Sequence, residues 1–224
     1  MIIRDLTVDW AWVRNSVLEK ERILPSSGSE IVSAAGASIK KARKIALPIA
    51  MTLLKKIVSI GNGSIKVEGG ATLSGSSLAA FLNGAEYISL FLVTIGPAIE
   101  KEASVLMAGG DTLSGYMLDR TGSFAVESLA ENLEDRLRKE YGAKNKSVSM
   151  RFSPGYCDWP IQEQSILDKL IDFSKINVRL TESLMMVPKK SISGLVGIGP
   201  KGLFSKAGSQ CAICNSKDCG YRRI

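Results

Sequence analysis

The sequence predicts an α+β fold, in which helices and strands follow one another without strict alternation. Residues 49–60 are apolar and rich in β-branched side chains. The alternating segment 65–68 follows them across a Gly-Asn-Gly-Ser turn, a pattern typical of a β-hairpin. Residues 111–141 carry apolar side chains three or four positions apart, as one long amphipathic helix requires. Because the segments do not alternate one for one, we expect an α+β arrangement rather than a doubly wound parallel sheet.

The segments before the hairpin predict one short strand and two helices. Residues 1–8 suit a short strand, and residues 10–22 have helical character that ends before Pro25. A second helix is expected over residues 29–45, where apolar side chains keep approximately helical spacing. Pro48 ends this helix, because a proline inside a helix removes a hydrogen bond and clashes with the preceding turn.

After the hairpin, the sequence predicts a short helix, a strand and a further helix. These elements cover residues 74–82, 86–95 and 97–107, and Pro97 suits the first turn of the last of them. A Gly-Gly pair then ends that helix, and Asp111 can cap the long helix that follows.

The long helix is expected to bury one face and to contain one unusual position. Gly122 weakens the helix and marks either a bend or a point of close packing. Glu134 and Arg138 lie one turn apart and can form an ion pair. The expected buried stripe consists of Leu118, Thr121, Ala125, Leu129, Leu133 and Leu137.

The last third of the chain predicts a strand, a helix and a final strand. These elements are expected over residues 147–152, 160–174 and 191–198. In the helix the side chains of Leu167, Leu170 and Ile171 are expected to point inward, because they lie three or four residues apart or side by side on one face.

Composition and charge argue against several classes of function. The 224-residue chain has a formal net charge of +7, but its tightest basic cluster, at residues 40–44, has no interleaved aromatic side chains for base stacking. A nucleic-acid partner is therefore not expected. No apolar run reaches the roughly 18 residues of a membrane span, and the N-terminus lacks a signal-peptide layout. We therefore expect a cytoplasmic location and no membrane partner. The lack of histidine excludes Ser-His-Asp catalysis and His-based zinc sites.

Two phrases in the last third contain the residues best suited to binding chemistry. The first runs from Arg151 to Pro160 as Arg-Phe-Ser-Pro-Gly-Tyr-Cys-Asp-Trp-Pro. The second runs from Leu180 to Gly194 as Leu-Thr-Glu-Ser-Leu-Met-Met-Val-Pro-Lys-Lys-Ser-Ile-Ser-Gly. The guanidinium of Arg151 can hold a carboxylate through two parallel hydrogen bonds, and Gly155 lets the backbone approach a ligand without an intervening side chain.

These two phrases resemble the S-adenosylmethionine-binding activation domain of cobalamin-dependent methionine synthase. Residues 94–100 and 118–131 also fit, and the likeness covers about residues 75–200. The resemblance implies a mixed or antiparallel sheet with flanking helices. It divides the chain into an N-terminal helical and hairpin portion (1–74), an activation-domain-like core (75–204) and a cysteine-rich tail (205–224).

The resemblance also implies a function. A free-standing relative of this domain is expected to reactivate a corrinoid methyltransferase by reductive methylation of cob(II)alamin, with S-adenosylmethionine as the methyl donor. The implied partners are a corrinoid protein or cobalamin-dependent methyltransferase, which carries the cobalamin, and flavodoxin or ferredoxin as electron donor.

A set of site residues follows from the same resemblance. Arg151 is expected to take the carboxylate of the methionine moiety, Glu127 to face the corrinoid partner, and Glu182 to have a polar or structural role. The turn of the site is expected to consist of Pro154, Gly155 and Tyr156. A second wall of the site, contributed by the second phrase, is expected to consist of Ser193 and Gly194.

The chain departs from the family pattern at several positions, and the departures after Gly194 leave two other functions open. Ser123 stands where a second acid is expected, one turn before Glu127. Leu195-Val196-Gly197 follows the Ser-Gly pair where the family has aromatic residues. The alternatives are a module that docks a corrinoid protein without S-adenosylmethionine, and an iron–sulfur electron carrier to a corrinoid protein. Trp159, in the first phrase, is a candidate to stack on adenine or a buried packing residue.

Three of the four cysteines lie close together in the C-terminal tail, at Cys211, Cys214 and Cys219. With Cys157 as a fourth ligand, these thiolates could hold zinc or another structural metal, or an iron–sulfur cluster next to the Gly-Tyr turn. A redox thiol pair and a tail without metal are the remaining interpretations.

Overall fold

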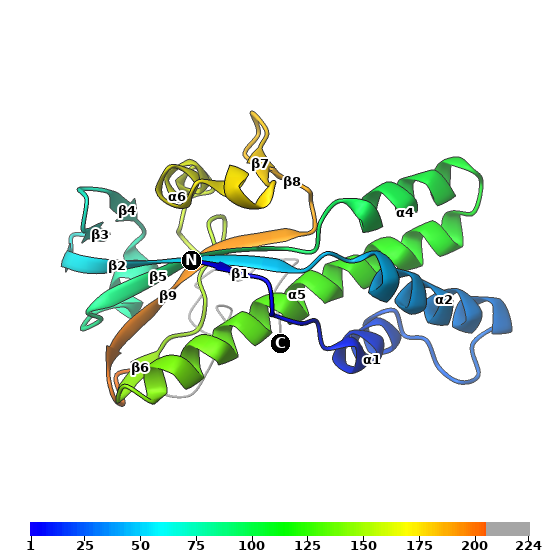
Figure 1. The fold of residues 1–224 in the computed structure, drawn as a ribbon, viewed down its shortest axis with the longest axis horizontal. Helices are drawn as coiled ribbons and strands as arrows, with labels where there is room; N and C mark the ends of the chain where they lie inside the picture. Colours follow the sequence, from blue (N-terminus) through cyan, green and yellow to red (C-terminus); the bar gives the residue numbers. More distant parts are fainter. Residues whose placement is uncertain (205–224) are drawn as a thin grey trace.

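The computed structural model describes residues 1–204, in which a sheet lies between two layers of helices. In Figure 1 the sheet is seen close to edge-on, with the long helix α5 (Thr112–Gly142) below it and α6 (Glu163–Ile171) above it. These two helices matter most for the site, because the segment that joins the sheet to α6 contains the first sequence phrase.

The main sheet of the described residues has seven strands, and all of its pairings are antiparallel. The strands are β1 (Ile2–Ile3), β2 (Ile49–Gly61), β3 (Ser64–Val67), β4 (Thr72–Ser74), β5 (Tyr87–Thr94), β6 (Lys146–Val148) and β9 (Ser191–Pro200). Their order is β4-β3-β2-β5-β9-β6, and β1 pairs with β2. Strand β5 is central, because it pairs over eight residues with β2 on one side and with β9 on the other. Both the 1–74 and the 75–204 portions therefore contribute strands to one sheet.

The helices fall into two groups that cover opposite faces of the sheet. One face packs against α1 (Trp10–Lys20), α2 (Ser29–Ile45), α4 (Ala98–Ala108) and α5. The other face packs against α3 (Ser76–Phe81), α6 and the 3₁₀ helix η1 (Phe173–Ile176). A separate two-stranded hairpin, β7 (Arg179–Leu180) and β8 (Met186–Val187), projects next to η1 in Figure 1. Two hydrophobic cores result, one on each face.

The α+β prediction is confirmed, and so are the main features of the long helix. Asp111 caps α5 by accepting a hydrogen bond from the Ser114 backbone N–H at 3.1 Å. Every residue of the expected stripe, from Leu118 to Leu137, is buried. Gly122 is a point of close packing, since a Cβ there would lie 2.7 Å from Cγ2 of Ile99.

Several predicted boundaries were wrong. The expected strand over 147–152 is paired only over β6 and then leaves the ladder, returning at a single bridge between Phe152 and Leu195. The expected helix over 160–174 divides into α6 and η1, because Asp172 adopts a left-handed conformation with φ +62°. Strand β4 and the β7–β8 hairpin were not predicted, since both are too short to show an alternating pattern.

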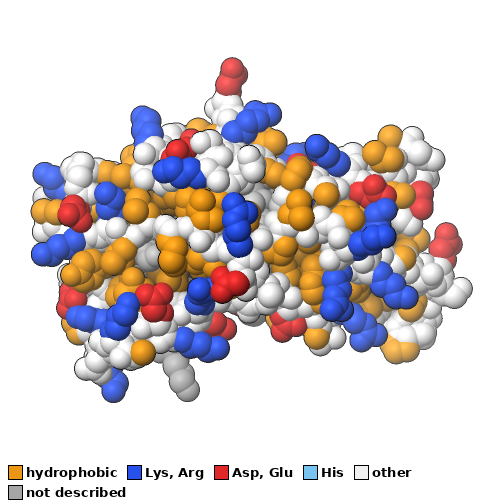
Figure 2. Space-filling view, in the orientation of Figure 1, with side chains coloured by type: hydrophobic (Ala, Val, Ile, Leu, Met, Phe, Trp, Pro, Cys, Tyr) orange, Lys and Arg blue, Asp and Glu red, His pale blue; other side chains and the backbone are white. Residues whose placement is uncertain are grey.

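The visible surface shows no single charged patch. Figure 2 shows Lys and Arg side chains spread over the whole face, interspersed with acidic and apolar ones. This distribution agrees with the scattered basic residues of the sequence. Within residues 1–204, no helix has the length and apolar character needed to cross a membrane.

Candidate functional site

Arg151 reaches from the edge of the sheet to the face of α5. Its neighbours Met150 and Phe152 are buried in the core on the α6 side of the sheet, so the alternation of an extended chain directs Arg151 to the opposite side. There its Nη2 atom donates to Oε2 of Glu127 at 2.6 Å, and its Nη1 atom lies 3.5 Å from Oε2 of Glu134. The residue expected to bind a carboxylate is thus held by two carboxylates of the protein itself.

Glu134 links two arginines underneath this site. It is buried, and it also pairs with Arg138, as the spacing of one turn predicted. Burial raises the pKa of Glu134 above its ordinary value, while the positive charges of Arg138 and Arg151 act in the opposite direction. Glu134 is the more buried of the two carboxylates that contact Arg151, since 8% of its side chain is exposed against 24% for Glu127.

The Gly-Tyr turn is closed by its own backbone hydrogen bonds. The Gly155 N–H donates to the Trp159 carbonyl at 2.8 Å, and the Trp159 N–H donates to the Tyr156 carbonyl at 3.1 Å. Gly155 has φ +89°, a conformation that glycine adopts without strain. Pro154 is buried, whereas Tyr156 is 47% exposed. The turn thus presents the Tyr156 side chain outward and uses the Gly155 N–H internally.

Two side chains anchor this turn to the α6 side of the sheet. Trp159 is 1% exposed and lies against Gly75, so it is a packing residue and is not free to stack on adenine. Asp158 accepts two hydrogen bonds from the Ser77 backbone N–H, at 2.9 and 3.2 Å, in the first turn of α3. These contacts fix the first phrase against the hairpin region of the sheet.

The second wall lies on β9, at the level where the first phrase runs alongside it. Gly194 has no room for a side chain, because a Cβ would lie 2.1 Å from the Phe152 carbonyl oxygen. Phe152 and Leu195 exchange two backbone hydrogen bonds of 2.8 Å at this point. Ser193 faces the α6 side of the sheet, where its hydroxyl accepts a hydrogen bond from Gln164 Nε2 at 2.8 Å. Gly194 therefore lets the Arg151 segment pair with β9.

The structure brings together some of the residues expected at the site, whereas Ser193 faces Gln164 of α6 instead. Arg151, Glu127 and the Gly194 wall lie around the junction of β9 and α5. Glu182 lies apart from them, exposed in the loop between β7 and β8. Figure 1 shows this hairpin on the α6 side of the sheet, opposite α5.

Known protein families and solved structures include relatives of this chain. The family model described as "Vitamin B12 dependent methionine synthase, activation domain" matches residues 70–209. The chain belongs to this family. A solved structure, "Crystal Structure of the MetH Reactivation Domain bound to AdoHcy", superimposes with a TM-score of 0.65 at 20% sequence identity. The match covers 94% of this chain and 80% of that one, and at this identity it shows that the two share a fold.

Two side chains next to the candidate site were not predicted from the sequence. The first is Glu134, whose spacing in the sequence predicts a pair with Arg138 alone and which also contacts Arg151. The second is Lys190, whose Nζ atom lies 2.7 Å from Asp119 and 2.9 Å from the hydroxyl of Ser123 on α5. A signal for the second was present, since Ser123 departs from the acid expected at that position.

The expected metal site lies largely outside the described residues. Cys157 is in the Gly-Tyr turn, half-buried and with φ +53°, whereas Cys211, Cys214 and Cys219 fall among residues 205–224, outside the part of the chain that the structure describes. Within residues 1–204, no group of three or more His, Cys, Asp or Glu side chains is placed to hold a metal ion.

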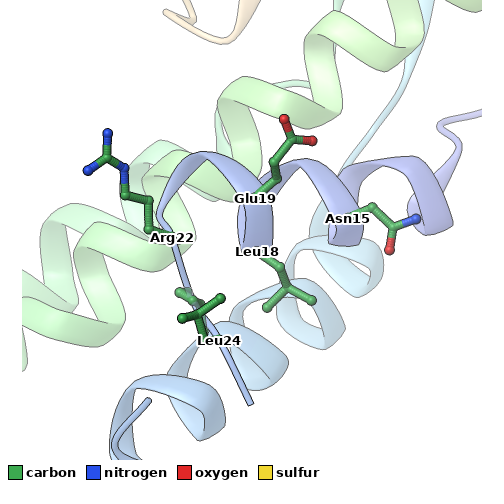
Figure 3. A pocket seen from close by; sticks show the side chains of 6 residues that line it. Asn15, Leu18, Glu19, Arg22 and Leu24 are labelled. Carbon is green, nitrogen blue, oxygen red and sulfur yellow. The ribbon is translucent and has the colours of Figure 1, made fainter. Parts of the chain in front are cut away.

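A surface depression at the end of α1 does not coincide with the site. Figure 3 shows the Leu18 and Leu24 side chains on one side of the α1 backbone, with the charged ends of Glu19 and Arg22 on the other. None of the residues that the two sequence phrases contain lines it. Its lining consists of Asn15, Leu18, Glu19, Arg22, Ile23 and Leu24.

Proposed function

We propose that this activation domain binds S-adenosylmethionine and presents its methyl group to a corrinoid protein, for the reductive methylation of cob(II)alamin. The observation that carries the proposal is the Arg151–Glu127 ion pair, 2.6 Å long, next to the point where the first phrase packs against β9 at Gly194. Membership of the activation-domain family and the shared fold with a domain bound to AdoHcy support this assignment.

An ion pair of this kind suits a ligand with an amino-acid end. Such a ligand carries a carboxylate and an ammonium group, so it can exchange partners with Arg151 and Glu127. Its carboxylate takes the guanidinium, and its ammonium takes the glutamate. Both protein charges then keep a counter-ion, which avoids the large cost of leaving a partly buried charge uncompensated. A ligand that has only a carboxylate would displace Glu127 and offer it no replacement for the guanidinium.

Glu134 keeps Arg151 in place during this exchange. It lies 3.5 Å from Nη1 of Arg151 while Nη2 contacts Glu127, so it holds a different nitrogen of the same guanidinium. The planar guanidinium has five N–H donors, enough for both carboxylates at once. We therefore place the ligand carboxylate at the Nη2 side of Arg151.

In the proposed reaction, a one-electron reduction of cob(II)alamin to cob(I)alamin is followed by transfer of the sulfonium methyl group to cobalt, which leaves S-adenosylhomocysteine. The chain's own contribution is to bind and orient the donor. Flavodoxin or ferredoxin is the proposed source of the electron, and the corrinoid protein supplies the cobalamin. Glu127, the more exposed member of the Arg151–Glu127 pair, is the side chain proposed to face the corrinoid protein.

Calorimetric titration with S-adenosylmethionine and S-adenosylhomocysteine tests the proposal. Wild-type protein is expected to bind both, Arg151→Ala to bind neither, and Glu127→Gln to bind more weakly, because the amide cannot pair with an ammonium group. Arg136→Ala, which removes a partly exposed arginine from α5, the helix that contains Glu127, is the control and should bind normally. Equal affinities of wild type and Arg151→Ala would refute the assignment.

A second candidate function is a docking module for a corrinoid protein that does not use S-adenosylmethionine. It is favoured by the fact that Arg151 is already neutralised by two carboxylates, and by the Leu195-Val196-Gly197 segment in place of aromatic residues. Under this alternative, Arg151→Ala should still capture a corrinoid protein in a pull-down. Loss of capture together with loss of ligand binding favours the first proposal.

A further inference from the structure

Lys190 forms a nearly buried connection between β9 and α5. It immediately precedes β9, and its side chain is 10% exposed. Its Nζ atom lies 2.7 Å from Oδ1 of Asp119 and donates to the hydroxyl of Ser123 at 2.9 Å. Asp119 and Ser123 are one turn apart on α5, so the ammonium group spans that turn.

The Lys190 side chain packs over Gly122 of α5, where no side chain is in its way. Gly122 lies beneath the Lys190 stem, and a Cβ at Gly122 would approach Cε of Lys190 to 3.3 Å and Cγ2 of Ile99 to 2.7 Å. The glycine that interrupts the long helix therefore allows both α4 and the Lys190 stem to lie close to α5.

The main chain on both sides of Lys190 is also fixed. The Lys190 carbonyl accepts a hydrogen bond from the Ile95 N–H at 3.2 Å, and the neighbouring Lys189 N–H donates to Oε2 of Glu100 at 2.7 Å. Ser191 donates through its hydroxyl to the Pro188 carbonyl at 2.7 Å. The Lys190 side chain is the part of this segment that reaches across to α5.

The connection is adjacent to the proposed ligand site. Ser123, which accepts from Lys190, lies one turn before Glu127, which accepts from Arg151. On the sheet side, Lys190 leads directly into the strand that carries Gly194. Successive turns of α5 thus contact Lys190, which precedes the strand of the second wall, and Arg151, which belongs to the first phrase.

We propose that Lys190 is a positioning residue for this site: its ammonium group, held by Asp119 and Ser123, fixes the start of β9 relative to α5 and so sets the separation between the Gly194 wall and the Arg151–Glu127 pair. This inference rests on the proposed function, because it concerns affinity for the same ligand. The charge is essential to it, since a neutral side chain of equal length would fill the space over Gly122 without binding the two oxygens.

The test compares Lys190→Met, which keeps the length and removes the charge, with Lys190→Arg, which keeps the charge. Lys189→Met, at the exposed neighbouring position, is the matched control. Lys190→Met is expected to weaken the binding of S-adenosylhomocysteine by roughly tenfold or more in calorimetry. The substitution removes the nearly buried ammonium group together with its contacts to Asp119 and Ser123. It should also speed amide hydrogen exchange at residues 191–194. Lys190→Arg should restore most of the affinity, and Lys189→Met should match wild type.

The outcomes separate this inference from the proposed function. If wild-type protein does not bind S-adenosylmethionine or S-adenosylhomocysteine, the proposed function fails and the positioning role fails with it. If wild type binds and Lys190→Met binds equally well, only the role of Lys190 is overturned. Faster exchange at 191–194 without a change in affinity also overturns it, since the connection is then purely structural. Should Lys190→Met fail to fold, Ser123→Ala removes one of the two acceptors and is expected to weaken binding in the same direction.

Discussion

Arg151 and Glu127 are separated by 24 residues in the sequence, yet Nη2 of the arginine and Oε2 of the glutamate lie 2.6 Å apart. The two side chains are only 17% and 24% exposed. This pair joins the segment after β6 to the middle of α5, and so it connects the sheet edge to the longest helix. Its position gives it a structural role, to which the proposed function adds the binding of a ligand.

Removing the guanidinium should destabilise the fold as well as abolish ligand binding. Arg151→Ala leaves Glu127 and the buried Glu134 without their shared partner. We expect a loss of about 2 kcal/mol in the free energy of unfolding, between the values typical of exposed and of buried ion pairs. Urea denaturation of wild type and variant measures this change. An unchanged midpoint would show that the pair contributes nothing to stability.

Two glycine-to-alanine substitutions should have opposite effects. Gly194→Ala places a Cβ 2.1 Å from the Phe152 carbonyl oxygen, so the first phrase has to move away from β9. We expect a loss of about 2–3 kcal/mol and weaker ligand binding. Gly36→Ala, on the exposed face of α2, meets no atom within 4 Å, and alanine favours a helix over glycine by up to about 1 kcal/mol. Thermal denaturation should therefore show a lower midpoint for the first variant and an equal or higher one for the second.

Stability should depend on pH through Glu134. Burial raises the pKa of Glu134 in the folded protein above its ordinary value of 4.5, so the folded state binds this proton more readily than the unfolded chain. The favourable contribution is complete below pH 4.5 and is lost as the pH rises through the raised pKa. Glu134→Gln does not titrate, so the stability of wild type relative to this variant should fall from acidic to neutral pH. Urea denaturation over a pH series measures the difference, and a difference that grows toward neutral pH would contradict this assignment.

The cysteine-rich tail predicts a metal site that includes Cys214. Metal analysis of protein purified without oxygen should find either zinc, or iron with the visible absorbance of an iron–sulfur cluster. Cys214→Ala should lose that metal, because a Cys-x-x-Cys pair supplies two of the ligands. Cys157→Ala tests whether the thiol in the Gly-Tyr turn is the fourth ligand. Protein that contains no metal under these conditions would contradict the prediction of a metal site in the tail.

The local features of this activation domain were readable from the sequence. The stripe from Leu118 to Leu137 predicted α5, and Asp111 predicted its first residue, because helix periodicity and capping depend on neighbouring residues only. Gly122 predicted either a bend or a point of close packing, and the structure shows close packing. The two phrases around Arg151 and Gly194 indicated the family, because a family pattern is carried by residue types and their spacing along the chain.

The tertiary structure decided what these residues contact. The sequence predicted that Arg151 binds a carboxylate, but only the packing of α5 against the sheet edge shows that Glu127 and Glu134 already occupy it. The sequence could not show that Trp159 is buried, or that the Lys190 side chain reaches Asp119 on α5. The reason is physical: helix and strand propensities act between neighbouring residues, whereas these contacts join segments far apart in the chain and form only when the sheet brings them together.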